Sequence, residues 1–181
     1  MKKALLHKTT FLFVFSILLT LRGFAQTTFT VGDLNYQVND DGVSVTIISS
    51  VGGQGATGEL NIPESVNYEG NDYAVTAIGD YAFLYGFFTG GLNIPNSITT
   101  IGDGAFAYCS CFTGDLIIPN SVTSIGYGAF QICFGFTGNL TIPNSVVSIG
   151  DFAFNSCDGM TGTLSIPSSV TSLGPDTFSY T

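Results

Sequence analysis

Three cysteines recur at a fixed step in this chain, and they are the residues best placed for chemistry. Cys109, Cys133 and Cys157 follow one another at intervals of 24 residues. If segments of that length stack, the Cα atoms lie about 5 Å apart, inside the disulfide window of roughly 4.4–6.8 Å. Parallel, inward-facing side chains are better described as small core hydrophobes, so the spacing favours buried free thiols. One disulfide, within the row or to Cys111, stays the alternative.

Aspartates recur in a similar way, although less regularly. Asp80, Asp103 and Asp151 share one repeat position, and Tyr127 interrupts the row. Calcium takes about 6–8 oxygen ligands, so two neighbouring carboxylates fall short, and no calcium-loop motif is present. We expect these aspartates to be solvated turn residues. Zinc binding is disfavoured as well, because the single histidine is His7 and the chain has no C-x-x-C pair.

Catalysis and the binding of anions lack their usual residues. All basic side chains and the single histidine stand in the first 25 residues: Lys2, Lys3, His7, Lys8 and Arg22. Residues 26–181 therefore offer no serine–histidine triad, Schiff-base lysine or phosphate clamp. They carry 13 acidic side chains and a formal charge of −13, which argues against binding nucleic acid or an anionic membrane surface. We expect a protein that is not an enzyme and has no cofactor or metal.

The segments that position these side chains repeat. The sequence LNIPNSITTIGDGAFAYCSCFTGD begins at Leu92, with copies from Leu116 and Leu140 and a shorter one from Leu164. An earlier copy begins at Leu60 and is interrupted by an insertion of about one hairpin. A period of roughly 20–50 residues is typical of solenoids, in which each unit is stabilised largely by its neighbours. We count five such coils of about 24 residues each.

Every coil has apolar positions that should face the interior. The L-x-I spacing has the period of two that is typical of a strand, and a proline then ends it. The S-V-T-S-I-G segment is a second short extended run, and A-F-x-x-C is expected to form a single helical turn. The inward rows are Leu92, Leu116, Leu140 and Leu164; Ile94, Ile118, Ile142 and Ile166; Ile98, Val122, Val146 and Val170; Ile101, Ile125, Ile149 and Leu173; Ala105, Ala129 and Ala153; Phe106, Phe130, Phe154 and Phe178; and Phe88, Phe112, Phe136 and Met160.

The repeat L-x-I-P-x-S-V-T-S-I-G-x-x-A-F-x-x-C resembles the BspA-type, or treponemal-type, leucine-rich repeats of bacterial surface and secreted proteins. The resemblance covers about 120 residues. It implies a right-handed solenoid of the α/β-horseshoe class with a sheet on its concave side, and roles in adhesion or protein binding. Together with the residue pattern it predicts a strand-dominated leucine-rich-repeat solenoid with single helical turns, five coils and an N-terminal β-hairpin cap.

The N-terminus has the three parts of a secretory signal. A basic start precedes an apolar run at 11–21, and Gly23-Phe24-Ala25 suits cleavage. Because a membrane span needs about 20 apolar residues, we expect a signal peptide over 1–25, no span after its removal, and export to the cell surface or the medium. Residues 26–58 are predicted as an N-terminal β cap with a Gly-rich connection, and 59–181 as the solenoid with a hairpin insertion at 67–75.

The candidate binding site follows from the strand pattern. Positions that flank the inward leucines should be exposed on the concave sheet, where solenoids commonly bind their partners. They are small, polar and varied: Glu59, Asn61, Asn93, Asp115, Ile117, Asn139, Thr141, Thr163 and Ser165. Tyr127, Phe152 and the hairpin tyrosines Tyr68 and Tyr73 are alternative contacts, because partly exposed aromatic rings favour stacking on protein or sugar.

These features together predict a secreted or surface-displayed binding protein, adhesin-like and without enzymatic activity, that engages a protein partner through its repeats. One alternative is a glycan-binding module, which requires Tyr68 and Tyr73 to be exposed side by side. The other is a structural element that assembles by stacking through its open C-terminal coil, since no separate cap follows the repeat that starts at Leu164.

Overall fold

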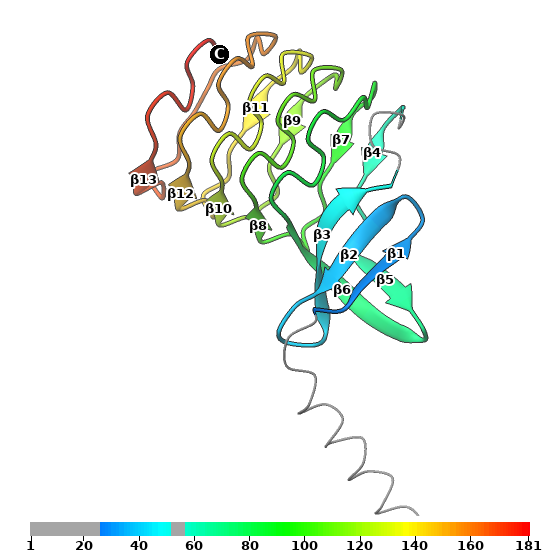
Figure 1. Ribbon diagram of the computed structural model, residues 1–181. Coiled ribbons are helices and arrows are strands. Elements are labelled where there is room, and N and C mark those ends of the chain that lie inside the picture. The colour runs from blue at the N-terminus through cyan, green and yellow to red at the C-terminus, as the bar shows by residue number, and fades with distance from the viewer. Residues whose placement is uncertain (1–25, 52–56) are drawn as a thin grey trace, which may run out of the picture.

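The computed structural model describes residues 26–51 and 57–181. In this part, a row of stacked coils continues from a small antiparallel β-sheet near the N-terminus (Figure 1). The predicted signal peptide, 1–25, and part of the Gly-rich connection, 52–56, lie outside the described residues.

Three antiparallel strands form the cap. They are β1 (Thr28–Val31), β2 (Leu34–Val38) and β3 (Ser44–Ser50). A two-residue turn at Gly32 and Asp33 joins the first pair, and Gly32 takes the positive φ of 58° that glycine tolerates best. Val43 precedes β3 and is exposed.

The cap is joined to the first coil by strand pairing. Strand β3 runs parallel to β6 (Asn71–Ile78), and the Gly79 N–H extends the contact by donating to the Ile47 carbonyl at 2.8 Å. Strand β5 (Ser65–Tyr68) lies antiparallel on β6, so the insertion is a hairpin. Its turn is Glu69-Gly70, with φ of 51° and 81°, as in a type I′ hairpin turn.

The second extended run of each coil continues this sheet. The strands are β8 (Thr100–Ile101), β10 (Ser124–Ile125), β12 (Ser148–Ile149) and β13 (Ser172–Leu173). They pair in parallel and in register, in the order β1-β2-β3-β6-β8-β10-β12-β13, with β5 on β6. The resulting nine-stranded sheet runs along one side of the stack (Figure 1).

The L-x-I segments pair over a shorter distance. They form β4 (Leu60–Asn61), β7 (Leu92–Asn93), β9 (Leu116–Ile117) and β11 (Leu140–Thr141). These strands make two separate parallel pairs, β4 with β7 and β9 with β11. The segment at 164–166 forms no strand. The continuous sheet is therefore built from S-V-T-S-I-G segments, and the L-x-I side consists of short bridges.

The A-F-x-x-C segments do not form the predicted helical turn, and the described residues contain no helix. A helix needs N–H groups bonded to carbonyls four residues earlier. Instead, the Phe106 N–H donates to Ala129 in the next coil at 2.8 Å, whereas the Ala107 N–H donates back to Gly104 at 3.0 Å. Alternate N–H groups thus bond to the next coil or close a local turn, so these segments belong to the stack of coils.

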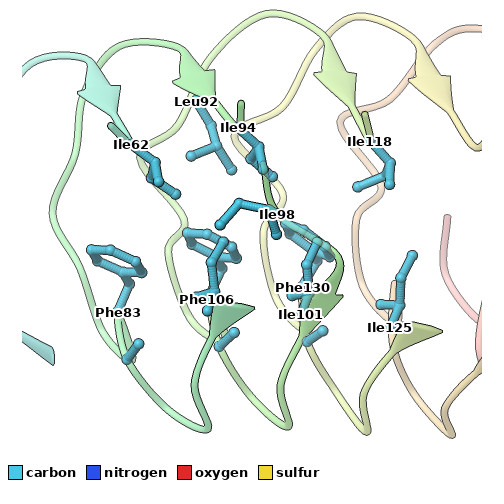
Figure 2. Packing of buried hydrophobic residues seen from close by; sticks show 14 of the residues in the cluster. Ile62, Phe83, Leu92, Ile94, Ile98, Ile101, Phe106, Ile118, Ile125 and Phe130 are labelled. Atoms are coloured by element: carbon cyan, nitrogen blue, oxygen red, sulfur yellow. The ribbon is translucent and has the colours of Figure 1, made fainter. Parts of the chain in front are cut away.

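Inside the stack, equivalent side chains lie in columns (Figure 2). Phe83, Phe106, Phe130, Phe154 and Phe178 stack ring on ring, with centroids 5.1–5.4 Å apart. Phe88, Phe112 and Phe136 form a second aromatic column, with centroids 5.5 and 5.2 Å apart. The expected inward rows are therefore confirmed through the fourth coil, apart from Met160, which is partly buried.

In the fifth coil the inward prediction is wrong. Leu164, Ile166 and Leu173 are exposed, and Val170 and Phe178 are only partly buried. No further coil of the described chain packs against their outer side. A side chain in a solenoid is covered by the coils on both sides of it. These residues are apolar like their equivalents in the inner coils, but in the described chain a neighbouring coil covers them on one side alone.

Candidate binding site

The cysteine row is structural. All four cysteines have free thiols, and Cys109, Cys133 and Cys157 are buried. Each thiol donates to a phenylalanine carbonyl of the preceding coil, for example Cys133 Sγ to Phe106 O at 3.1 Å. Burial raises the pKa of the Cys109 and Cys157 thiols to about 12 and that of Cys133 well above its usual value. The thiols are therefore protonated hydrogen-bond donors of the core, and Thr181 replaces them in the fifth coil by donating to Phe154 O at 2.7 Å.

The aspartate row joins neighbouring coils. Asp80 Oδ1 accepts the Asp103 N–H at 2.8 Å, and Asp103 Oδ1 accepts the Tyr127 N–H at 2.7 Å. The equivalent partner of Asp151 would be residue 175, which is a proline and has no N–H. Among the described residues, no group of three or more His, Cys, Asp or Glu side chains is arranged to hold a metal ion. These carboxylates are exposed or half-buried turn residues with a defined bonding role.

The nine predicted site residues are all exposed. They lie in or next to the L-x-I segments, although only Asn61, Asn93, Ile117 and Thr141 belong to strands. Two pairs of them are linked across coils: Asn93 Nδ2 donates to Asn61 Oδ1 at 3.3 Å, and Asn139 donates from its backbone and side-chain nitrogens to Asp115 Oδ1. Thr163 and Ser165 lie in the fifth coil, where the segment is not a strand.

A shallow groove of about 580 Å³ brings three of the nine together. Asn93, Ile117 and Thr141 line it in adjacent coils, and Ile117 presents an apolar side chain that is 57% exposed. We call this hollow the strand groove. Sequence reasoning missed its other wall, which is formed by the turn after each strand: Pro95, Asn96, Pro119, Asn120 and Pro143. The recurring P-N-S signal marked these residues only as turn formers.

Glu59 and Asn61 belong to a different hollow. They line a cavity of about 700 Å³ between the cap and the first coil, together with Tyr36 and Phe88. The predicted site is therefore divided, because these two residues face the cap, whereas Ile62 and Glu64 of the same coil line the strand groove. Asp115, Asn139, Thr163 and Ser165 line neither hollow.

The predicted aromatic contacts also differ from one another. Tyr68 and Tyr73 are half-buried against Phe29 of the cap, with the Tyr68 and Phe29 rings stacked 4.2 Å apart. The condition set for a glycan platform, that these two tyrosines are exposed side by side, is not met. Exposed Tyr127 and half-buried Phe152 do contact each other, with ring centroids 5.6 Å apart.

A family model for the BspA type leucine rich repeat region matches residues 76–181, in six copies. The chain belongs to this family. The match covers more than half of the sequence and includes the stacked coils from the end of β6 onward. It counts one copy more than the five coils counted from the 24-residue period.

Solved structures show the same fold as this BspA-type protein. The leucine-rich-repeat protein TpLRR of T. pallidum is 23% identical, with a TM-score of 0.69, over 84% of this chain and 67% of that one. The pneumococcal vaccine antigen PcpA is 18% identical, with a TM-score of 0.53, over 86% of this chain and 48% of that one. The chain thus spans about half the length of PcpA. No curated protein matches the sequence.

Charge is distributed unusually in this BspA-type protein. Residues 26–181 contain 13 acidic side chains and no lysine, arginine or histidine, so no salt bridge between side chains can form among them. Some of the carboxylates accept backbone N–H groups, as Asp80, Asp103 and Asp115 do. Within the described residues, no helix is long and apolar enough to cross a membrane.

Proposed function

We propose that this BspA-type protein is a secreted or surface-displayed binding protein of adhesin-like character, without enzymatic activity, and that it engages a protein partner through the strand groove. The observation that carries this proposal is the groove itself, in which the same repeat position presents Asn93, Ile117 and Thr141 from three successive coils. The predicted signal peptide and the likeness to PcpA, described as a vaccine antigen, support display outside the cell.

The chemistry of the strand groove suits a protein surface. Asn93 and Thr141 offer hydrogen-bond donors and acceptors, and Ile117 between them offers apolar area. Specific interfaces combine an apolar centre with a polar rim in this way. The prolines at the groove wall hold the turns rigidly, so little conformational entropy is lost when a partner binds.

An array of host proteins and polysaccharides tests this proposal, with the affinity of each hit measured by surface plasmon resonance. Asn93→Arg or Thr141→Arg would place a long charged side chain in the strand groove, and we expect the affinity for a protein partner to fall at least tenfold. Thr137→Arg is the matched control, because Thr137 is also exposed but does not line the groove. Far-UV circular dichroism should be unchanged in all three variants. An affinity equal to wild type in both groove variants would contradict the proposed site.

A second function is favoured by the fifth coil. Leu164, Ile166 and Leu173 expose apolar side chains on the outer side of the described stack. Burial of such a face against another chain is favourable, which supports assembly by end-to-end stacking. Light scattering over a range of concentrations distinguishes the two functions, since assembly predicts a mass that rises with concentration without any added partner.

A further inference from the structure

A group of aromatic residues, exposed except for the half-buried Phe152, lies on the turn segments of the first four coils. It consists of Tyr81, Tyr85, Tyr108, Tyr127 and Phe152, which we call the turn face. Tyr81 is the most exposed of them, at 57%. None of the five lines the strand groove. The turn face is therefore a second surface, separate from the one proposed to bind a protein through the L-x-I segments.

Backbone conformation does not require aromatic residues at these positions. Tyr81, Tyr85, Tyr108 and Phe152 have φ between 57° and 62°, in the left-handed region, which is unfavourable for most side chains. Gly104 takes the same conformation at the position equivalent to Tyr81, and glycine does so without strain. The backbone conformation alone favours glycine or asparagine, so the aromatic residues at these positions need another explanation, either contacts between coils or use of the surface.

The rings form contacts from coil to coil. The Tyr85 and Tyr108 centroids are 4.8 Å apart, and those of Tyr127 and Phe152 are 5.6 Å apart. Tyr81 lies over Gly104, because a Cβ added to that glycine would come within 2.5 Å of the tyrosine ring. Gly104 in turn donates its N–H to the Tyr127 carbonyl at 2.7 Å. The turn face thus contains two ring pairs that each join neighbouring coils, and a fifth ring, Tyr81, that covers a glycine of the next coil.

Carboxylates accompany the rings. Asp80 and Asp103 are exposed beside Tyr81 and Gly104 in the chain, and the Oδ1 atom of each is fixed by a backbone N–H of the next coil. Asp151, which is half-buried, directly precedes Phe152 in the chain. Residues 26–181 have no basic side chain, so no side-chain cation within this part of the chain neutralises them. The turn face therefore combines electron-rich rings with oriented negative charge.

We propose that the turn face binds a basic segment of a partner protein, with arginine preferred over lysine. A guanidinium group over a tyrosine face gains about 0.5–2 kcal/mol through the cation–π interaction, and a neighbouring carboxylate adds a charge-assisted hydrogen bond. Arginine is preferred because its planar group stacks on a ring while it donates to the acid. Acidic partners are repelled by the same charges.

Short peptides test this proposal with the full mature chain. The probes are (Arg-Gly)4, (Lys-Gly)4 and (Glu-Gly)4 peptides and a neutral cello-oligosaccharide, titrated by isothermal calorimetry at low and moderate salt. We expect the arginine peptide to bind most tightly, its affinity to fall as salt rises, and the glutamate peptide not to bind. Tightest binding of the oligosaccharide would overturn the proposal and indicate a glycan surface instead.

Two sets of variants locate the binding. The double variant Tyr85→Ala, Tyr108→Ala should weaken the arginine peptide at least tenfold, whereas Tyr180→Ala is the matched control, because Tyr180 occupies the same left-handed row in the fifth coil. Asp80→Asn with Asp103→Asn keeps the Oδ1 acceptor and so preserves the fold, but it removes two charges and should weaken binding and flatten the salt dependence. Unchanged peptide affinity in both sets would overturn the proposal without bearing on the strand groove.

Discussion

The third and fifth coils place the same residue types at the same repeat positions and bury them differently. Leu116 is 0% exposed and Leu164 is 39% exposed; at the next inward position, Ile118 is 2% exposed and Ile166 is 43% exposed. The third coil lies between two neighbours, whereas in the described chain the fifth coil is covered on one side. Burial in this protein is thus a property of the stack and not of the single repeat, as expected for a quasi-one-dimensional fold.

The largest effect that tests this comparison is the loss of a leucine side chain. Leu116→Ala should lower the free energy of unfolding by about 3–5 kcal/mol, because it leaves a cavity in a fully packed interior. Leu164→Ala should cost about 1 kcal/mol, because much of that side chain already contacts water. Urea unfolding followed by circular dichroism measures both values.

A smaller difference between the two variants in the loss of free energy of unfolding would contradict the proposed contrast between the third and fifth coils. Equal losses would mean that the face of the fifth coil is covered in solution, for example by self-association. The measurement is therefore made at several protein concentrations, and a loss for Leu164→Ala that grows with concentration would favour the assembly function.

A smaller effect separates the fourth and fifth coils, in which Cys157 and Thr181 donate the same kind of hydrogen bond. Burial raises the pKa of the Cys157 thiol to about 12, whereas an unfolded thiol has a pKa of about 8.5. Above that value the unfolded chain loses the proton and the folded chain keeps it, so stability falls as pH rises. The stabilisation is complete below about pH 8.5 and is lost progressively up to about pH 12. Thr181 has no such dependence.

The Cys157→Ser variant isolates the part of the pH dependence of stability that comes from the Cys157 thiol. Between pH 8 and pH 10, wild type should lose about 2 kcal/mol more stability than the variant, at about 1.4 kcal/mol for each pH unit above the unfolded pKa. Urea unfolding at the two pH values gives the difference, and the ionisation of tyrosines cancels because both proteins contain the same ones. A parallel decline in the two proteins would show that the Cys157 thiol is accessible in the folded state.

The sequence predicts those features that depend on residue type and spacing alone. The 24-residue period and the chemical type of each row locate the columns of Phe106 and Leu116 and the exposed positions of Asn93 and Thr141. Features that depend on contacts with a neighbouring coil were predicted wrongly or were missed. The A-F-x-x-C spacing imitates one helical turn, but hydrogen bonds to the next coil, such as Phe106 to Ala129, decide its conformation.

The two surfaces proposed to bind partners were predicted only in part for the same reason. Ile117 could be assigned to the surface from strand alternation, but the groove around it depends on the turns at Pro119 and Pro143 in successive coils. Tyr85 and Tyr108 stand at variable positions of the repeat, and only stacking brings their rings within 4.8 Å of each other. A signal was available, because aromatic residues recur where a left-handed turn would favour glycine.

The smallest expected effect concerns the aspartate row. The third coil offers a backbone N–H to the aspartate of the second coil, whereas the fifth coil offers none to the aspartate of the fourth. Asp103 accepts the Tyr127 N–H at 2.7 Å, whereas Asp151 stands opposite Pro175, which has no N–H to donate. Asp103→Ala should therefore lower the free energy of unfolding by about 1 kcal/mol, the usual value of a net hydrogen bond, and Asp151→Ala by much less. Because both changes remove one negative charge, the difference in urea midpoints reports the bond and not the electrostatics. Equal midpoints would mean that water satisfies the Tyr127 N–H as well as the carboxylate does, and that burial alone distinguishes the inner coils from the outer one.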